Sequence, residues 1–183
     1  MKKFYKVLVI ALCAVMLVAG STAATVAYLS MKTAPVQNTF TAGNINIELK
    51  QDNQLDTSKM VPGIVYEVDP KVIVKANSES CWLFIKIEKP DNFNTFLNYG
   101  MVEGWTSLEN GVYYRQVGAT TTEDVTFGII KDDQIVADAS CTKAQYDTLN
   151  YATLDLKITA YAVQQVGFDT AAAAWTEAQK LDS

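Results

Sequence analysis

The sequence predicts a mainly β protein, an antiparallel β-sandwich of jelly-roll type with two or three short helices. Apolar and polar residues alternate along most of the chain beyond residue 40, which is the pattern of half-buried strands. Turn residues recur roughly every ten positions, as in sandwiches built from many short strands. The 183 residues, 49% hydrophobic and 19% charged, suit one compact domain.

The first 27 residues have the pattern of a secretory signal peptide. Three lysines stand before an uncharged run over residues 7–20, and small residues follow that run. A retained membrane anchor is the alternative, because the apolar stretch extends to Leu29 and ~20 apolar residues can cross a bilayer. We favour cleavage between Ala27 and Tyr28, since the strongly apolar part is shorter than a membrane span.

Cleavage would leave an acidic chain of 156 residues. Residues 1–27 contain three lysines and no acidic residue, so the formal net charge falls from −5 to −8. Nucleic acid is not an expected partner, because phosphate recognition needs clustered Lys and Arg. We divide the chain into a signal peptide, 1–27, an N-terminal segment, 28–40, and a β-sandwich domain, 41–183.

Strand patterns recur along the sandwich domain. They cover residues 44–49, 71–75, 82–89, 105–109, 112–117, 125–131, 134–139 and 153–165. Asn110-Gly111 predicts a type I′ hairpin turn that sets Leu108 opposite Tyr113. The strands on either side of Asp132-Asp133 are expected to pair as a second hairpin. In the last strand, aliphatic residues alternate with a more polar face that includes Tyr161.

Two segments have helical signals. Residues 142–149 are predicted as a short helix, because Thr142 and Gln145 match a capping box. Asp169 is expected to cap an alanine-rich helix that ends near residue 180 and turns Trp175 inward. Residues 93–99 fit either a third short helix or a loop.

Two cysteines, Cys81 and Cys141, remain after cleavage. In an exported chain they could form a disulfide that closes a long loop, with a stabilisation of about 4 kcal/mol in the chain-entropy model. The alternative is two buried thiols that act as small apolar side chains. We favour free thiols, because Cys81 starts an apolar strand and Cys141 lies near a helix start.

The chain contains no His, which excludes Ser-His-Asp and Cys-His sites and His-ligated zinc proteases. It also lacks glycine-rich phosphate loops and C-x-x-C pairs, so we predict no catalytic, cofactor or metal site. Three acidic clusters could offer oxygen ligands to calcium, but none has EF-hand spacing, which favours solvated loop charges. The clusters are Glu123-Asp124, Asp132-Asp133 and Asp52 with Asp56.

The N-terminal segment, residues 28–40, is mostly uncharged and extended in pattern. Its large apolar or aromatic residues are Tyr28, Leu29, Met31, Val36 and Phe40. One interpretation is a frayed terminus. The other is a donor strand that adds to an open sheet edge of a neighbouring copy, which gives filaments because head-to-tail addition does not close. A segment folded back into its own sheet would argue against this second interpretation.

Four stretches resemble the TasA/camelysin family. They are residues 24–29 (ATVAYL), 38–49 (NTFTAGNINIEL), 61–63 (VPG) and 160–165 (AYAVQQ). The resemblance implies a jelly-roll subunit of extracellular biofilm-matrix fibres, exported through a SipW-type signal peptidase by a Gram-positive bacterium. It further implies assembly of copies through N-terminal donor strands, with other matrix proteins as additional partners.

The leading hypothesis is therefore a secreted or cell-surface structural subunit that polymerises through residues 28–40. A camelysin-type surface metallopeptidase is one alternative, and the absence of His argues against it, so we do not expect an enzyme. A monomeric surface adhesin is the other alternative.

Overall fold

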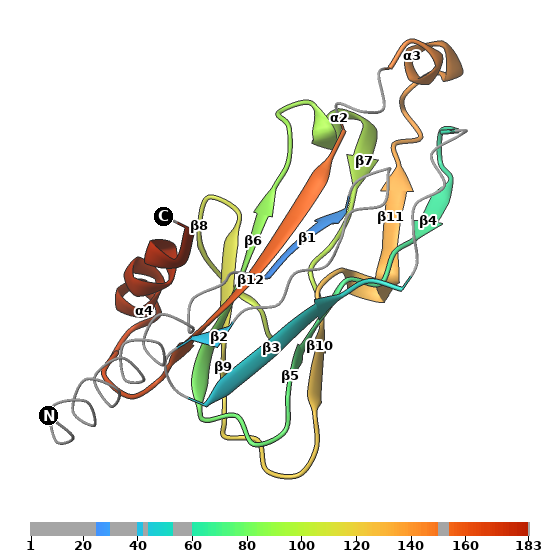
Figure 1. Ribbon diagram of the computed structural model, residues 1–183. Coiled ribbons are helices and arrows are strands. Elements are labelled where there is room, and N and C mark those ends of the chain that lie inside the picture. Colours follow the sequence, from blue (N-terminus) through green and yellow to red (C-terminus); the bar gives the residue numbers. More distant parts are fainter. Residues whose placement is uncertain (1–24, 30–39, 42–43, 53–59, 150–153, 183) are drawn as a thin grey trace, which may run out of the picture.

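The computed structural model describes residues 25–29, 40–41, 44–52, 60–149 and 154–182. Within them the protein is mainly β, with three antiparallel sheets and three short α-helices, which confirms the predicted β-sandwich-like class (Figure 1). Most of the expected signal peptide, residues 1–24, lies outside the described residues, as do Met31, Val36 and Asp56.

The largest sheet has five strands in the order β1-β12-β6-β9-β8. They are β1 (Thr25–Leu29), β12 (Leu156–Gln164), β6 (Cys81–Glu88), β9 (Val112–Val117) and β8 (Thr106–Glu109). A four-stranded sheet contains β10 (Val125–Gly128), β5 (Lys71–Val74), β3 (Ile45–Lys50) and β2 (Phe40–Thr41), in that order. A third sheet contains β4 (Val65–Glu67), β11 (Gln134–Ala137) and β7 (Leu97–Asn98).

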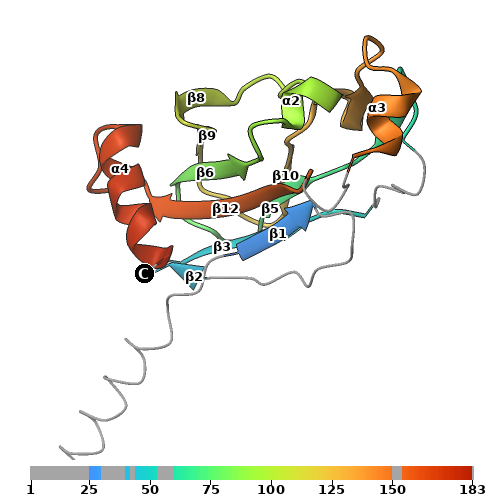
Figure 2. The same ribbon diagram turned by 90° about the horizontal axis from the view of Figure 1, so that it is seen from above.

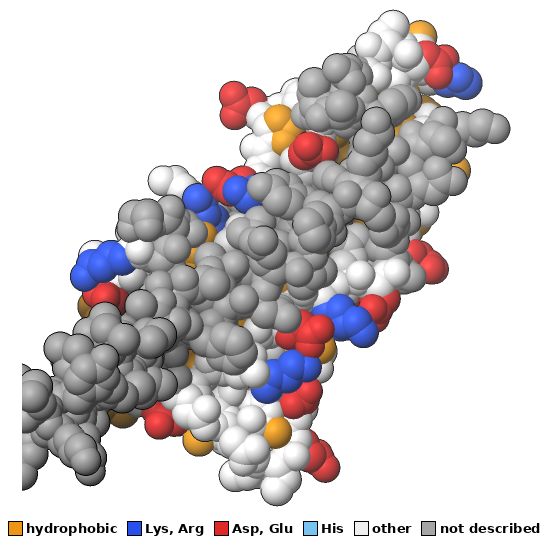
Figure 3. All heavy atoms as spheres, viewed as in Figure 1, with side chains coloured by type: hydrophobic (Ala, Val, Ile, Leu, Met, Phe, Trp, Pro, Cys, Tyr) orange, Lys and Arg blue, Asp and Glu red, His pale blue; other side chains and the backbone are white. Residues whose placement is uncertain are grey.

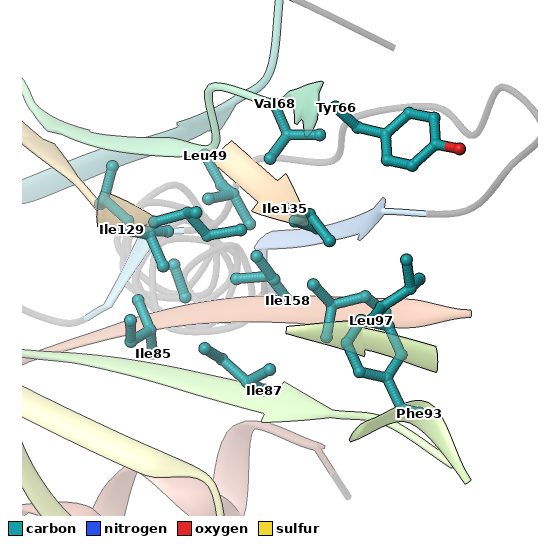
Figure 4. Close-up of a cluster of buried hydrophobic side chains, with 14 of the residues drawn as sticks. Leu49, Tyr66, Val68, Ile85, Ile87, Phe93, Leu97, Ile129, Ile135 and Ile158 are labelled. Atoms are coloured by element: carbon teal, nitrogen blue, oxygen red, sulfur yellow. The ribbon is translucent and has the colours of Figure 1, made fainter. Parts of the chain in front are cut away.

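The main core lies between these sheets, because β3 packs against β12 and β1 (Figure 2). Leu49 from β3 is fully buried and belongs to one apolar cluster with Ile85 of β6 and Ile158 of β12 (Figure 4). Each such aliphatic side chain contributes roughly 1.5–3 kcal/mol when it leaves water. The alternating pattern of residues 44–49 thus places its aliphatic face in the core, as predicted.

The second face of the five-stranded sheet is covered by helix α4 (Ala171–Ala178), which packs on β12 and β6. Trp175 points inward as predicted, with its ring centroid 5.3 Å from that of Phe84 and 5.2 Å from that of Tyr161. The predicted cap at Asp169 is wrong. Thr170 caps the helix instead, because its backbone is extended and its hydroxyl oxygen accepts a hydrogen bond from the Ala173 amide at 3.2 Å.

The remaining helical elements are short. They are α2 (Phe93–Phe96), α3 (Lys143–Asp147) and the 3₁₀ turns η1 (Lys131–Asp133) and η3 (Gln179–Asp182). The predicted capping box is confirmed at α3, where Thr142 and Gln145 bond each other's backbone amides. The ambiguous residues 93–99 form helix α2 followed directly by strand β7.

The hairpin of β8 and β9 is confirmed, and both turn residues have the positive φ that a type I′ turn requires, 26° at Asn110 and 79° at Gly111. The predicted register is wrong. Ser107 lies opposite Tyr113, because a bulge at Leu108 shifts the pairing before Glu109 reaches Val112.

We expect Gly111→Ala to lower the free energy of unfolding by about 1–3 kcal/mol, because the left-handed conformation strains any side chain. A Cβ atom there would also lie 2.5 Å from the Ile87 carbonyl oxygen. The matched control is Gly118→Ala, since nothing lies within 4 Å of a Cβ at that position and its φ is not left-handed. Urea titration followed by circular dichroism measures both changes, and equal effects would contradict the turn geometry.

The second predicted hairpin is wrong, because β10 and β11 belong to different sheets. Residues on either side of Asp132-Asp133 are already bonded elsewhere. The Lys131 amide donates to the Gly100 carbonyl at 2.9 Å, and β11 pairs with β4 and β7. The Val68 amide donates to the Asp133 carbonyl at 2.7 Å, so the turn itself is bonded to the residue that follows β4. Long-range partners thus outcompete the local pairing.

Candidate functional site

The candidate site is the outer edge of β12, the edge that does not pair with β6. Strand β1 occupies it in antiparallel register, with Thr25 opposite Ala160 and Leu29 opposite Leu156 (Figure 1). The expected cleavage bond lies in the middle of this ladder, because Ala27 is opposite Ile158 and the next residue, Tyr28, is opposite Lys157. The residues on both sides of the expected cleavage bond therefore form an edge strand of the five-stranded sheet.

β12 is buried on both faces. Its inner side chains, which include Ile158 and Ala160, belong to the core between the sheets. On the outer face, Tyr161 and Val163 are each 3% exposed, because they pack in a second cluster with α4. The sequence predicted a half-buried strand, and the helix explains why the more polar face is covered as well. A strand buried on both faces has the character of a central strand.

The other sheet edges in the described part of the chain look different. β4 has three residues and β2 and β7 have two each, while β8 carries a bulge. β10 has four residues, all exposed or half-buried. Short, exposed or bulged edges resist the addition of further strands. β12 has nine residues and is the longest strand described, so its outer edge stands out as the one suited to accept a partner strand.

The predicted donor residues fall into two groups. Tyr28 and Leu29 belong to β1, and Phe40 belongs to β2, where it lies opposite Asn46 of β3. Met31 and Val36 lie outside the described residues. The hypothesis expected a vacant edge, but residues 156–160 of β12 are paired with the chain's own β1. In the full chain Tyr28 and Leu29 are thus folded back into their own sheet, which argues against donor-strand exchange as long as β1 stays paired. Any exchange between copies has to displace that strand.

Sequence reasoning left the acceptor edge open. The sequence signal that could have identified it is the run Ile158–Val163, which contains no charged residue. In the structure, the outer residues of this run are as buried as its inner ones. Alternation alone cannot reveal such a strand, since a helix more distant in the sequence covers its second face.

Both cysteines are free thiols in the structure, as we favoured, and both are buried. Burial raises the pKa of Cys81 to about 12, which keeps this thiol protonated at neutral pH. The Cys141 thiol lies 3.3 Å from the Thr95 carbonyl oxygen and donates to it. A protonated, buried thiol is a poor nucleophile.

We therefore expect the native, processed protein at pH 8 to react slowly with a thiol-specific colorimetric reagent, and two thiols per chain to react once the protein is denatured. Prior treatment with reductant, followed by its removal, should leave the count unchanged. If the denatured protein showed no reactive thiols before reduction and two after it, Cys81 and Cys141 would form a disulfide instead.

Asp52 and Asp124, which belong to two of the three predicted acidic clusters, are bonded to lysines. The Lys71 ammonium lies 2.6 Å from an Asp52 carboxylate oxygen, and this bond is the main cause that lowers the pKa of Asp52. The pKa of Asp124 is lowered first by the hydrogen bond from the Ala76 amide and then by Lys75. Acidic and basic side chains accordingly lie next to each other on the surface (Figure 3). Within the described ranges, no three His, Cys, Asp or Glu side chains gather as a metal site would require.

In the part of the chain that the structure covers, no helix has the length and apolar character needed to span a membrane. Comparisons with known proteins found no match to the chain among family models, curated proteins or solved structures.

Proposed function

We propose that this protein is a secreted structural subunit of extracellular biofilm-matrix fibres, which polymerises by N-terminal donor-strand addition after its signal peptide is removed. Signal peptidase of the SipW type would release it, and copies of the same chain would be its main partners. The family resemblance of residues 24–29 and 38–49 supports this assignment.

The single observation that carries the proposal is the edge of β12. Its residues Leu156–Ala160 are largely buried on both faces. They pair with β1, the strand that contains the expected cleavage bond. An edge of this kind that loses its partner is a template for another strand, because its backbone amides and carbonyls are left unpaired between two apolar faces.

The length of the N-terminal segment also supports exchange between copies. In the chain's own sheet, residues 30–39 have to connect β1 to Phe40 of β2. A neighbouring copy imposes no such connection, so residues 28–39 are all available to pair there. Twelve residues are enough to span the nine residues of β12. The neighbour can therefore offer more residue pairs than the chain's own sheet can after cleavage.

Each added copy presents its own β12 edge and holds its N-terminal segment in the previous copy. The donor and acceptor are different surfaces, so the contact is head-to-tail and extends into a filament. The processed wild-type chain is expected to sediment as large assemblies and to show fibres by electron microscopy. A chain that stays monomeric at all concentrations would contradict the proposal.

We expect Leu29→Asp to suppress fibre formation, because an unpaired carboxylate is strongly disfavoured beside an apolar core. In the chain's own ladder this position lies opposite Leu156, which is 1% exposed. Leu29→Ile is the matched control and should assemble like the wild type. Sedimentation of both processed variants measures the effect, and equal assembly would show that Leu29 does not enter an apolar groove.

A further inference from the structure

We infer that the unprocessed chain is self-capped: strand β1 blocks the acceptor edge of β12 until signal-peptide cleavage cuts that strand in two. This inference rests on the proposed function and adds its regulation. Cleavage would then release the donor and open the acceptor in one step.

The expected cleavage bond lies within β1. β1 has five residues, and cleavage after Ala27 separates three of them, Thr25 to Ala27, from the two that stay with the domain. The residues that leave are those paired with Ile158, Thr159 and Ala160. These three β12 residues are each at most 2% exposed in the full chain.

Only two residues of β1 would remain with the domain after cleavage. Tyr28 and Leu29 would be left opposite Lys157 and Leu156, and two residues are shorter than the usual range of β-strands. Cleavage also places a new α-ammonium group at Tyr28, where the intact chain has an uncharged peptide bond. A charged chain end prefers water to a sheet. The stub is therefore expected to detach from β12.

Assembly would then depend on whether β1 is paired with β12. While β1 is intact, residues 156–160 of β12 have their backbone partners along this edge, so this stretch offers no template to another copy. Once the stub detaches, the edge is open and residues 28–39 are free to leave. The residues around the expected cleavage bond would thereby also prevent premature polymerisation during export, because they form β1.

A disulfide lock tests whether β1 blocks the edge. Tyr28 stays with the processed chain and lies opposite Lys157, so Tyr28→Cys with Lys157→Cys can tie the stub to its own β12. We expect the oxidised, processed double variant to lose fibre formation by at least about tenfold, because the tether keeps its own strand at a high effective concentration. Reduction should restore assembly.

The matched control ties the opposite edge of β12. Glu88 of β6 lies opposite Lys157 and its carboxylate is 3.2 Å from the Lys157 ammonium. Glu88→Cys with Lys157→Cys therefore shares one substitution with the lock and leaves the outer edge free. Its fibre formation should not depend on oxidation. Redox-independent assembly of the Tyr28 lock would overturn the inference.

Hydrogen exchange provides a second measurement that does not need polymerisation. The full chain in detergent micelles is compared with processed chain held at a concentration where it is monomeric. Amides of residues 156–160 that point to β1 should exchange about tenfold faster or more after processing, as expected for a freed edge. Amides of the β6–β9 ladder serve as the internal control.

These outcomes separate the inference from the proposed function. If processed wild type never polymerises but the exchange difference is found, the fibre function fails and the self-capping stands. If fibres form and residues 156–160 exchange equally fast before and after processing, self-capping fails and the fibre function stands.

Discussion

A processed chain that lacks residues 28–36 is expected to remain monomeric at concentrations where the wild type forms fibres. The deletion removes Leu29, Met31 and Val36, the apolar residues of the predicted donor, and retains Phe40, which pairs with β3 through β2. The sandwich and the edge of β12 stay intact, so the variant keeps its acceptor and loses its donor. Sedimentation and electron microscopy measure the result.

Two controls make this result specific. Replacement of residues 28–36 by a glycine-serine segment of the same length keeps the chain length and should also give monomers, because such a segment offers no apolar side chains to the groove. The deleted chain can still accept a strand, so it should cap growing ends and shorten fibres when it is mixed with wild type. Unchanged fibres from the deleted chain would rule out the donor role.

Trp175→Ala is expected to lower the free energy of unfolding by about 3–5 kcal/mol, the usual loss for truncation of a buried tryptophan. Trp175 is 4% exposed and packs against Phe84 and, edge-on, against Tyr161. Its indole nitrogen also donates to a Glu109 carboxylate oxygen at 3.0 Å. The side chain thus joins α4 to β6, β12 and the end of β8, and its loss uncovers the outer face of β12.

Two variants control for this effect. Trp175→Phe keeps an aromatic ring and loses the hydrogen bond to Glu109, so a smaller loss of about 1 kcal/mol is expected. Thr176→Ala lies on the exposed side of the same helix and should stay within about 0.5 kcal/mol of the wild type. Urea unfolding followed by far-ultraviolet circular dichroism measures all three. A Trp175→Ala chain as stable as Thr176→Ala would show that α4 does not cover the sheet.

The features that sequence predicted correctly are those encoded within a few neighbouring residues. The capping box of Thr142 and Gln145, the turn at Asn110-Gly111 and the apolar face of β3 each depend on local spacing, and each is confirmed. The mainly β class follows from the sum of such signals.

The features that sequence did not predict depend on distant partners. The strands around Asp132-Asp133 have a plausible local turn, yet they do not pair with each other. The Lys131 amide bonds to Gly100 and β11 pairs with β4 instead. The bulge at Leu108 shifts a hairpin whose turn was correct. The covered outer face of β12 requires α4, and the occupied edge requires β1 from the opposite end of the chain. All of these partners are distant in the sequence, so a pattern over a few neighbouring residues cannot reveal them.

The central claim is that β12 of one copy receives the N-terminal segment of another. Cross-linking between variants that each carry one introduced cysteine tests it. The tagged acceptor carries Lys157→Cys, and the donors carry one cysteine at each position from 28 to 36 in turn. A link between a tagged and an untagged chain joins two copies, and it is expected to form through the introduced cysteines, because Cys81 and Cys141 are buried. After oxidation of mixed fibres, we predict tagged–untagged dimers whose yield alternates with period two along the donor, as in a paired strand. Fibres that form without any such dimers would contradict the claim.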